Sequence, residues 1–138
     1  MSMSGWIFTL AIVLIGTGYV FVERRVKAGM KARFASRASL EFNDFYDRFY
    51  KGSLDQDVVR ELMEHVAHEL TIPMGKLRPG DRFENELKPM RGMEFDSGRD
   101  LLIVELARMA KKRGIEVELK RIRTLDDYLR SMAGMYTR

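Results

Sequence analysis

The chain has 138 residues, a formal net charge of +4 and no cysteine. The lack of cysteine excludes disulfides, thiolate catalysis and cysteine metal sites, and it suits a reducing compartment. The length suits one small domain beside any membrane segment, and the sequence holds no glycine-rich phosphate loop or tandem repeat.

The N-terminal segment 5–22 is apolar and carries no charged side chain. A helix rises about 1.5 Å per residue, so this segment nearly crosses a hydrocarbon core of about 30 Å. Trp6 stands near one end of the segment, and Tyr19 and Phe21 stand near the other. Such rings favour the two membrane interfaces. We therefore predict a transmembrane anchor over residues 1–23.

The charge that follows the apolar segment predicts the orientation of the chain. Positive flanks stay on the cytoplasmic side, so we expect the N-terminus outside and the remaining chain in the cytoplasm, at a bacterial-type inner membrane. Each basic residue beside anionic lipid can gain on the order of 1 kcal/mol. This cluster explains the high pI without a nucleic-acid partner, and we expect none. The predicted membrane-surface residues are Arg24, Arg25, Lys27, Lys31 and Arg33.

Two other interpretations of the apolar segment compete with a membrane anchor. A cleaved signal peptide carries positive charge before its apolar core and small residues at the cleavage site. Here the charge comes after the core, and bulky side chains precede it. A helix buried in a soluble core is disfavoured because so short a chain could hardly enclose a helix that is apolar on every face.

Residues 24–52 are predicted to form a helical connector. Apolar residues recur every four positions from 26 to 38, with basic residues between them, which indicates an amphipathic helix at or just below the membrane surface. A second helix over residues 40–50 places aromatic rings on one side. We expect these rings to pack on the following domain, whereas an uncovered patch would need a protein partner. The partner-binding candidates are Phe42, Phe45, Tyr46 and Phe49.

Residues 53–138 are predicted to form a helical domain. The tetrapeptide 53–56, Ser-Leu-Asp-Gln, looks like a capping box that opens a helix running to about Thr71. His65 and His68 lie three positions apart among glutamates, a pattern that invites a metal hypothesis. A zinc site needs further ligands in a defined geometry, and a solvated helix face explains the same residues. We therefore predict no metal site.

A long connection and two more helices complete this domain. Phe83 and Leu87 are expected to anchor a helical turn of the connection inward. The segment 100–113 is a strongly apolar helix, predicted to be central to the core. Apolar and charged residues alternate over 115–119 as in a strand, but the sequence offers no convincing partner strand, so we predict an extended connection. Thr124 is expected to cap the last helix.

The order of these elements resembles the acyl carrier protein family. The likeness covers about residues 54–132, and its best segment is Lys-Leu-Arg-Pro-Gly-Asp-Arg-Phe at 76–83, followed by Glu-Leu at 86–87. Val-Glu-Leu at 104–106 and Thr-Leu-Asp-Asp-Tyr-Leu at 124–129 also look similar. The resemblance implies a small helical bundle. The predicted fold class is therefore all-α, a single N-terminal transmembrane helix followed by this bundle.

The sequence departs from the family where a working carrier would hold phosphopantetheine, on a serine in Asp-Ser-Leu at the start of the central helix. Aligning the helix through residues 104–106 puts Asp100 at the serine position, and aspartate cannot form the phosphodiester. A shifted alignment brings in Asp-Ser-Gly at 96–98, with Ser97 as the attachment candidate. Turn or cap chemistry is the plain alternative for this serine.

Three functions follow from these observations. The first is a non-enzymatic, membrane-anchored interaction module, an accessory or assembly subunit of a membrane protein complex, with lipid and other subunits as partners and no cofactor. The alternative is a membrane-tethered carrier with phosphopantetheine on Ser97. The third is an enzyme that uses His65 and His68. We do not predict it, because acid–base work needs groups that converge on a pocket.

Overall fold

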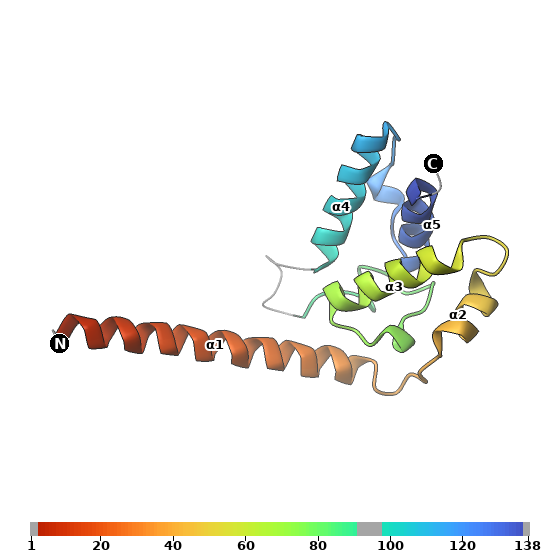
Figure 1. Cartoon of the computed structure of the whole chain (residues 1–138). Coiled ribbons are helices and arrows are strands. Elements are labelled where there is room, and N and C mark those ends of the chain that lie inside the picture. The colour runs from red at the N-terminus through yellow and green to blue at the C-terminus, as the bar shows by residue number, and fades with distance from the viewer. Residues whose placement is uncertain (1–2, 91–97, 137–138) are drawn as a thin grey trace.

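The structure is a computed structural model that describes residues 3–90 and 98–136. Within these ranges it is helical, and one long helix projects from a cluster of shorter ones (Figure 1). We refer to the cluster, residues 34–90 and 98–136, as the head. The helices are α1 (Met3–Arg33), α2 (Phe42–Phe49), α3 (Gln56–Leu70), α4 (Gly98–Arg113) and α5 (Leu125–Tyr136), with 3-10 turns η1 (Met74–Lys76) and η2 (Leu119–Arg121).

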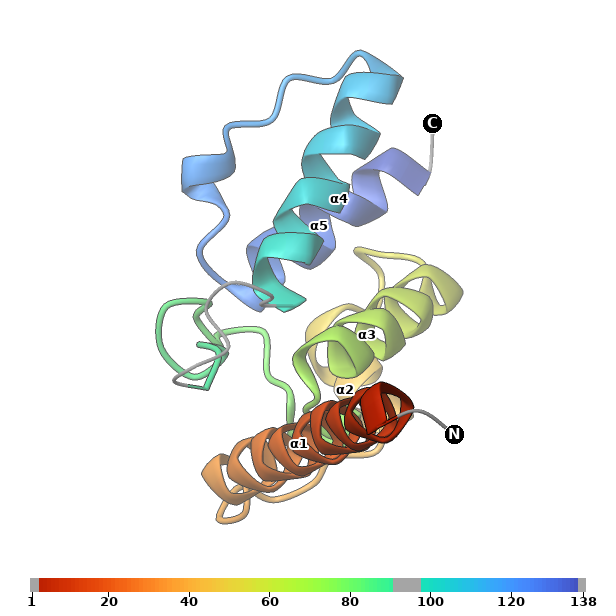
Figure 2. The same ribbon diagram turned by 90° about the vertical axis from the view of Figure 1, so that its left-hand side faces the viewer.

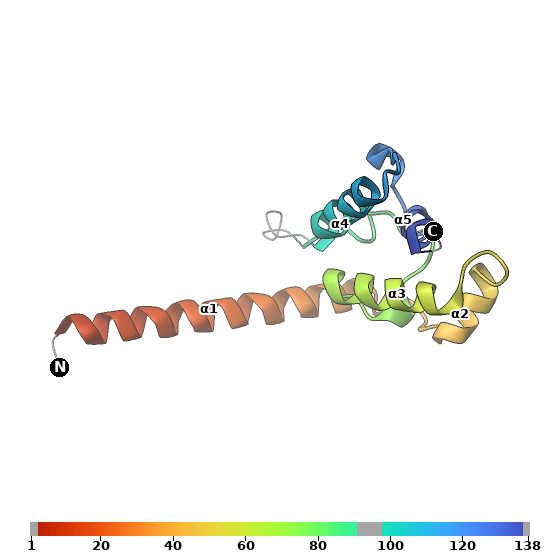
Figure 3. The same cartoon turned by 45° about the horizontal axis from the view of Figure 1, so that its top comes forward.

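Helix α1 runs without a break through the predicted anchor and into the predicted connector. The N-terminal half of α1 extends away from the head, as Figures 1 and 3 show. Lys31 and Arg33 occupy the last turn, where cations interact favourably with the helix dipole. The apolar repeat of the connector therefore lies on the same helix as the apolar anchor.

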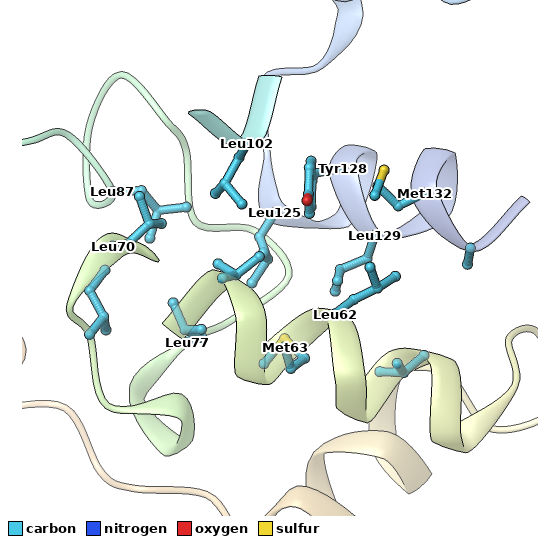
Figure 4. Packing of buried hydrophobic residues seen from close by; sticks show 14 of the residues in the cluster. Leu62, Met63, Leu70, Leu77, Leu87, Leu102, Leu125, Tyr128, Leu129 and Met132 are labelled. Carbon is cyan, nitrogen blue, oxygen red and sulfur yellow. The ribbon is translucent and has the colours of Figure 1, made fainter. Parts of the chain in front are cut away.

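Three helices form the centre of the head. Helix α3 packs against both α4 and α5, and α4 packs against α5. In the close view of Figure 4, Leu62 of α3 lies next to Leu129 of α5. The connector adds further side chains to the same buried cluster, namely Met30, Phe34, Phe42, Phe45 and Tyr50. The aromatic residues of this segment thus belong largely to the core.

The start of α3 differs from the predicted capping box. Asp55, and not Ser53, is the N-cap, and its side chain accepts hydrogen bonds from the backbone N–H groups of Asp57 and Val58. The hydroxyl of Ser53 donates instead to the carbonyl of Tyr50 in the preceding turn. Serine and aspartate both cap helices well. Because the Ser53 side chain is hydrogen-bonded in the turn after α2, Asp55 caps α3.

The loop before α5 is fastened by two sets of hydrogen bonds. The backbone N–H of Phe83 donates to the carbonyl of Arg123 at 3.0 Å, which joins the long connection to the α5 entrance. Thr124 and Asp127 cap α5 reciprocally, since the Asp127 N–H donates to the Thr124 hydroxyl and the Asp127 carboxylate accepts from the Thr124 N–H. The predicted cap is confirmed, and Phe83 and Leu87 are buried as expected.

Helix α4 begins two residues earlier than predicted, at Gly98. The first turn lies against the end of α3, because a Cβ atom at Gly98 would come within 2.1 Å of the Glu69 carbonyl oxygen. The prediction that α4 is central to the core holds for one side only. Leu102 and Leu106 are fully buried, whereas Val104 on the opposite side is 53% exposed.

Candidate functional site

The largest exposed apolar surface of the described chain is the N-terminal part of α1. From residue 6 to residue 33 this helix contains a window long and apolar enough to cross a membrane, and none of that window is buried against the head. Phe21, for example, is 68% exposed. An apolar surface of this extent is suited to lipid or to another apolar helix.

The predicted membrane-surface residues follow the apolar window on the same helix. Arg24, Arg25, Lys27 and Lys31 are exposed, and Lys27 forms an ion pair of 3.0 Å with Glu23. Arg33 has a different role. Its guanidinium donates hydrogen bonds to the carbonyls of Glu86 and Lys88 in the head.

The last turns of α1 are attached to the head by apolar contacts. Met30 and Phe34 are buried, and the methyl group of Met90 lies so close to Gly29 that a Cβ atom there would meet it at 2.6 Å. A glycine at this position lets the connection from α3 to α4 approach the helix. The helix therefore enters the head as part of its core.

An ion pair between a partly exposed arginine and a buried aspartate reinforces this attachment. The Arg37 guanidinium donates to both carboxylate oxygens of Asp81, at 2.9 and 2.8 Å, and to the carbonyl of Lys76 at 2.8 Å. Asp81 is only 3% exposed and also accepts from the backbone N–H of Arg78. One guanidinium nitrogen, Nη1, makes all three contacts, and hydrogen bonds between ionised groups of this type are stronger than those between neutral groups. We call this group of four residues the α1–head junction.

Arg78 extends the junction toward the chain that follows α1. Its guanidinium donates to the carbonyl of Ala38 at 2.6 Å, while the backbone N–H of Leu40 donates to the Gly75 carbonyl at 2.9 Å. Burial and the nearby Arg37 lower the pKa of the Arg78 guanidinium. The segment between α1 and α2 is thereby bound along η1 over several residues.

Most of the aromatic partner-binding candidates are covered by the head. Phe42 and Phe45 are buried, the guanidinium of Arg60 lies over the Phe42 ring at 4.2 Å, and the hydroxyl of Tyr46 donates to the Leu54 carbonyl. Phe49 is 37% exposed. In this structure a protein partner could reach Phe49 and the exposed part of Tyr46.

A groove of about 500 Å³ opens between α3, α4 and α5. At its edge, Nε2 of His65 lies 2.6 Å from Oε2 of Glu105, which joins α3 to α4. Burial raises the pKa of the Tyr136 hydroxyl, and the Glu61 carboxylate that accepts its hydrogen bond raises it further. Apolar residues form the rest of the lining, together with two cations: Leu62, Met109, Met132, Arg108 and Lys112.

The two histidines do not come together at a metal site. His65 pairs with Glu105, and within residues 3–90 and 98–136 no group of three or more metal-ligating side chains occurs. Ser97, the phosphopantetheine candidate, lies outside the described residues. The next residue, Gly98, is the first residue of α4.

Sequence reasoning missed the two long-range pairs, Arg37 with Asp81 and His65 with Glu105. Arg37 follows a run of basic residues in the sequence, and nothing local distinguishes it from its neighbours. The proline and glycine before Asp81 indicate a turn, but they do not identify the cation.

Comparison with protein-family models, with curated proteins and with solved structures finds no match for this chain.

Proposed function

We propose that this protein is a non-enzymatic, membrane-anchored interaction module that serves as an accessory or assembly subunit of a membrane protein complex. The observation that carries the proposal is the contrast between the two parts of α1. None of the apolar window is buried, whereas the end of the same helix is built into the head at Met30, and the chain directly after it at Phe34 and the α1–head junction. A helix of this kind holds a folded head at a fixed place beside a bilayer.

The proposed arrangement has the N-terminus outside a bacterial-type inner membrane and the head in the cytoplasm. The cations after residue 22 support it, since positive flanks remain on the cytoplasmic side. Membrane lipid and the other subunits of the complex are the proposed partners, with no nucleic acid.

The chain contains no cysteine, so single cysteines report topology without background. We expect Ser4→Cys to react with an impermeant maleimide added to intact cells, and Lys51→Cys to react only after the cells are opened. The protein should also remain in the membrane pellet after carbonate extraction. Reaction of Lys51→Cys in intact cells, or release of the full-length chain by carbonate, would refute the proposed arrangement.

A pull-down under mild conditions tests the interaction role. We expect other membrane proteins to co-purify in a gentle detergent and to be lost when the head is removed but α1 is kept. A monomeric species without companions in several mild detergents would contradict a role in a complex.

The alternative is a membrane-tethered carrier of the acyl carrier type, with phosphopantetheine on Ser97. The start of α4 directly after Ser97 favours it, because the family resemblance implies an attachment serine at the start of the central helix. Intact mass analysis of protein from its native cell tests this role. An added phosphopantetheine mass that is absent from Ser97→Ala would establish it, and an unmodified mass that a phosphopantetheinyl transferase cannot change would exclude it.

A further inference from the structure

One side of α4 is exposed and combines apolar with basic side chains. Its residues follow one another at spacings of three, four and three, which places them on a single side of the helix. Leu101 and Val104 are 42% and 53% exposed, and the two cations are also exposed. We call this side the α4 outer face. It consists of Leu101, Val104, Arg108 and Lys111, of which Arg108 also lines the groove between α3, α4 and α5.

The cations of the α4 outer face have no acidic partner in the described part of the chain. Six ion pairs occur there, and none of them includes Arg108 or Lys111. Exposed aliphatic side chains beside unpaired cations suit the interface of an anionic bilayer. The aliphatic groups can enter between headgroups while the cations meet phosphates.

The junction with α1 fixes how far the head lies from the apolar window. Met90 packs on Gly29, seven residues after Val22, the last residue of the apolar segment. Seven residues of helix measure about 10 Å. The headgroup layer of one leaflet is about 5–8 Å thick, and electrostatic attraction reaches about 8 Å further at physiological ionic strength. The head therefore begins close to where the headgroups end.

The direction of α4 brings its outer face toward the same layer. Figures 1 and 3 show α4 crossing the direction of α1, with its first turn level with the last turns of α1. Figure 2 views the molecule from the N-terminal side of α1, and α4 lies in front of α5 in that view. Because Leu102 and Leu106 are buried against the helices that α4 contacts, the outer face is on the side of α4 away from α3 and α5, and the side away from α5 is the nearer one in Figure 2.

We propose that the α4 outer face is a second membrane contact, which binds the anionic lipid headgroups that surround α1. The inference rests on the proposed membrane anchor and adds to it a fixed orientation of the head. A contact with lipid explains why this face lies close to the anchor. A binding site for a soluble protein would not need to lie there.

Single-cysteine labels in the full chain test the contact. The protein is reconstituted into nanodiscs of phosphatidylcholine, with or without phosphatidylglycerol, and carries an NBD label at Val104→Cys. Lys51→Cys on the remote side of the head and Ile12→Cys in the anchor are the controls. We expect lipids with spin-labelled headgroups to quench the label at 104 but not the label at 51, and phosphatidylglycerol to increase the quenching at 104.

A charge variant tests the electrostatic part of the proposal. One cation near an anionic surface is worth about a fivefold change in equilibrium, so Arg108→Gln/Lys111→Gln should weaken the docked state about 30-fold. The control variant Arg48→Gln/Lys51→Gln removes two exposed cations, one from α2 and one from the turn after it, and should leave the quenching at 104 unchanged.

The outcomes separate this proposal from the anchor itself. An embedded label at 12 with an unquenched label at 104 in both bilayers would refute the second contact and leave the anchor intact. A solvent-exposed label at 12 would refute the anchor. If the quenching at 104 changes neither when phosphatidylglycerol is added nor in Arg108→Gln/Lys111→Gln, binding to anionic headgroups is refuted. Protection of residue 104 in native membranes but not in nanodiscs would assign the face to a protein partner and overturn the lipid contact.

Discussion

Arg37 and Asp81 are 44 positions apart in the sequence, yet the Arg37 guanidinium donates to both carboxylate oxygens of Asp81 within 2.9 Å. Arg37 follows the last turn of α1. Asp81 lies in the connection between α3 and α4, and its carbonyl accepts a hydrogen bond of 2.9 Å from the backbone N–H of Leu125, the first residue of α5. This single pair therefore links the entrance of the head to its last helix.

Removing the cation of this pair should destabilise the head. Arg37→Ala leaves the buried Asp81 carboxylate without the cation that is hydrogen-bonded to it, and we expect a loss of about 3 kcal/mol in the free energy of unfolding. The head can be unfolded by urea in mild detergent micelles and followed by circular dichroism. Lys31→Ala removes an exposed cation and should change the stability by less than about 0.5 kcal/mol. Equal effects of the two substitutions would contradict the structural role of the pair.

Two buried tyrosines should respond in opposite ways to loss of the hydroxyl. Tyr50 donates to the Asp126 carboxylate at 2.8 Å, so Tyr50→Phe should cost about 1–2 kcal/mol. The hydroxyl of Tyr128 is buried with no hydrogen-bond partner among the described residues. Tyr128→Phe removes this unpaired group and should be neutral or stabilising by about 1 kcal/mol. Thermal unfolding of both variants checks the contrast, and a destabilised Tyr128→Phe would show that the hydroxyl has a partner.

A methyl group at Gly98 should disturb the contact between α3 and α4. The added Cβ atom would come within 2.1 Å of the Glu69 carbonyl oxygen, a backbone atom that cannot move aside on its own. We expect Gly98→Ala to lose about 1–3 kcal/mol of stability. In α5, Gly134 has open space around it, and Gly134→Ala should gain about 0.5–1 kcal/mol. Urea unfolding measures both changes in the free energy of unfolding. Changes of the same sign for the two substitutions would argue against this packing.

The cap of α5 should make the head sensitive to acid. Burial opposes ionisation of Asp127, but hydrogen bonds from the backbone N–H groups of Thr124 and Arg123 outweigh it and lower the pKa of the carboxyl. Because the folded pKa lies below the unfolded one, the stabilisation is present at neutral pH, above the unfolded pKa, and is lost as the pH falls through the folded pKa.

Asp127→Asn should therefore lower stability at pH 7 and flatten its decline toward acid. Thermal unfolding between pH 7 and about pH 3 measures both effects, since ordinary aspartates titrate near pH 3.9. The exposed Asp47→Asn serves as the control. An unchanged acid profile in Asp127→Asn would show that the cap does not govern it.

Local sequence patterns predicted the helices well, but they did not predict the contacts between residues far apart in the sequence. The Thr124 cap, the apolar helix after Gly98 and the inward positions of Phe83 and Leu87 follow from spacing and side-chain type. The start of α3 does not, because Ser53 and Asp55 both suit an N-cap and the turn after α2 decides between them.

The sites show the same division. The apolar run in α1 is visible in the sequence, and the structure leaves it uncovered. The pairing of His65 with Glu105 depends on how α3 meets α4, and the outward position of Val104 depends on which side of α4 the core takes. Neither is encoded by nearby residues, since apolar and charged side chains are both spread around the circumference of α4.

Helix α1 has no hinge between its apolar window and Arg33, and it ends inside the core of the head. If α1 crosses a bilayer as proposed, it would therefore join the lipid-embedded segment rigidly to the head. Apolar helices tilt when the bilayer thins, and the head would have to swing through the same angle. Bilayer thickness could in this way set which side of the head neighbouring proteins meet.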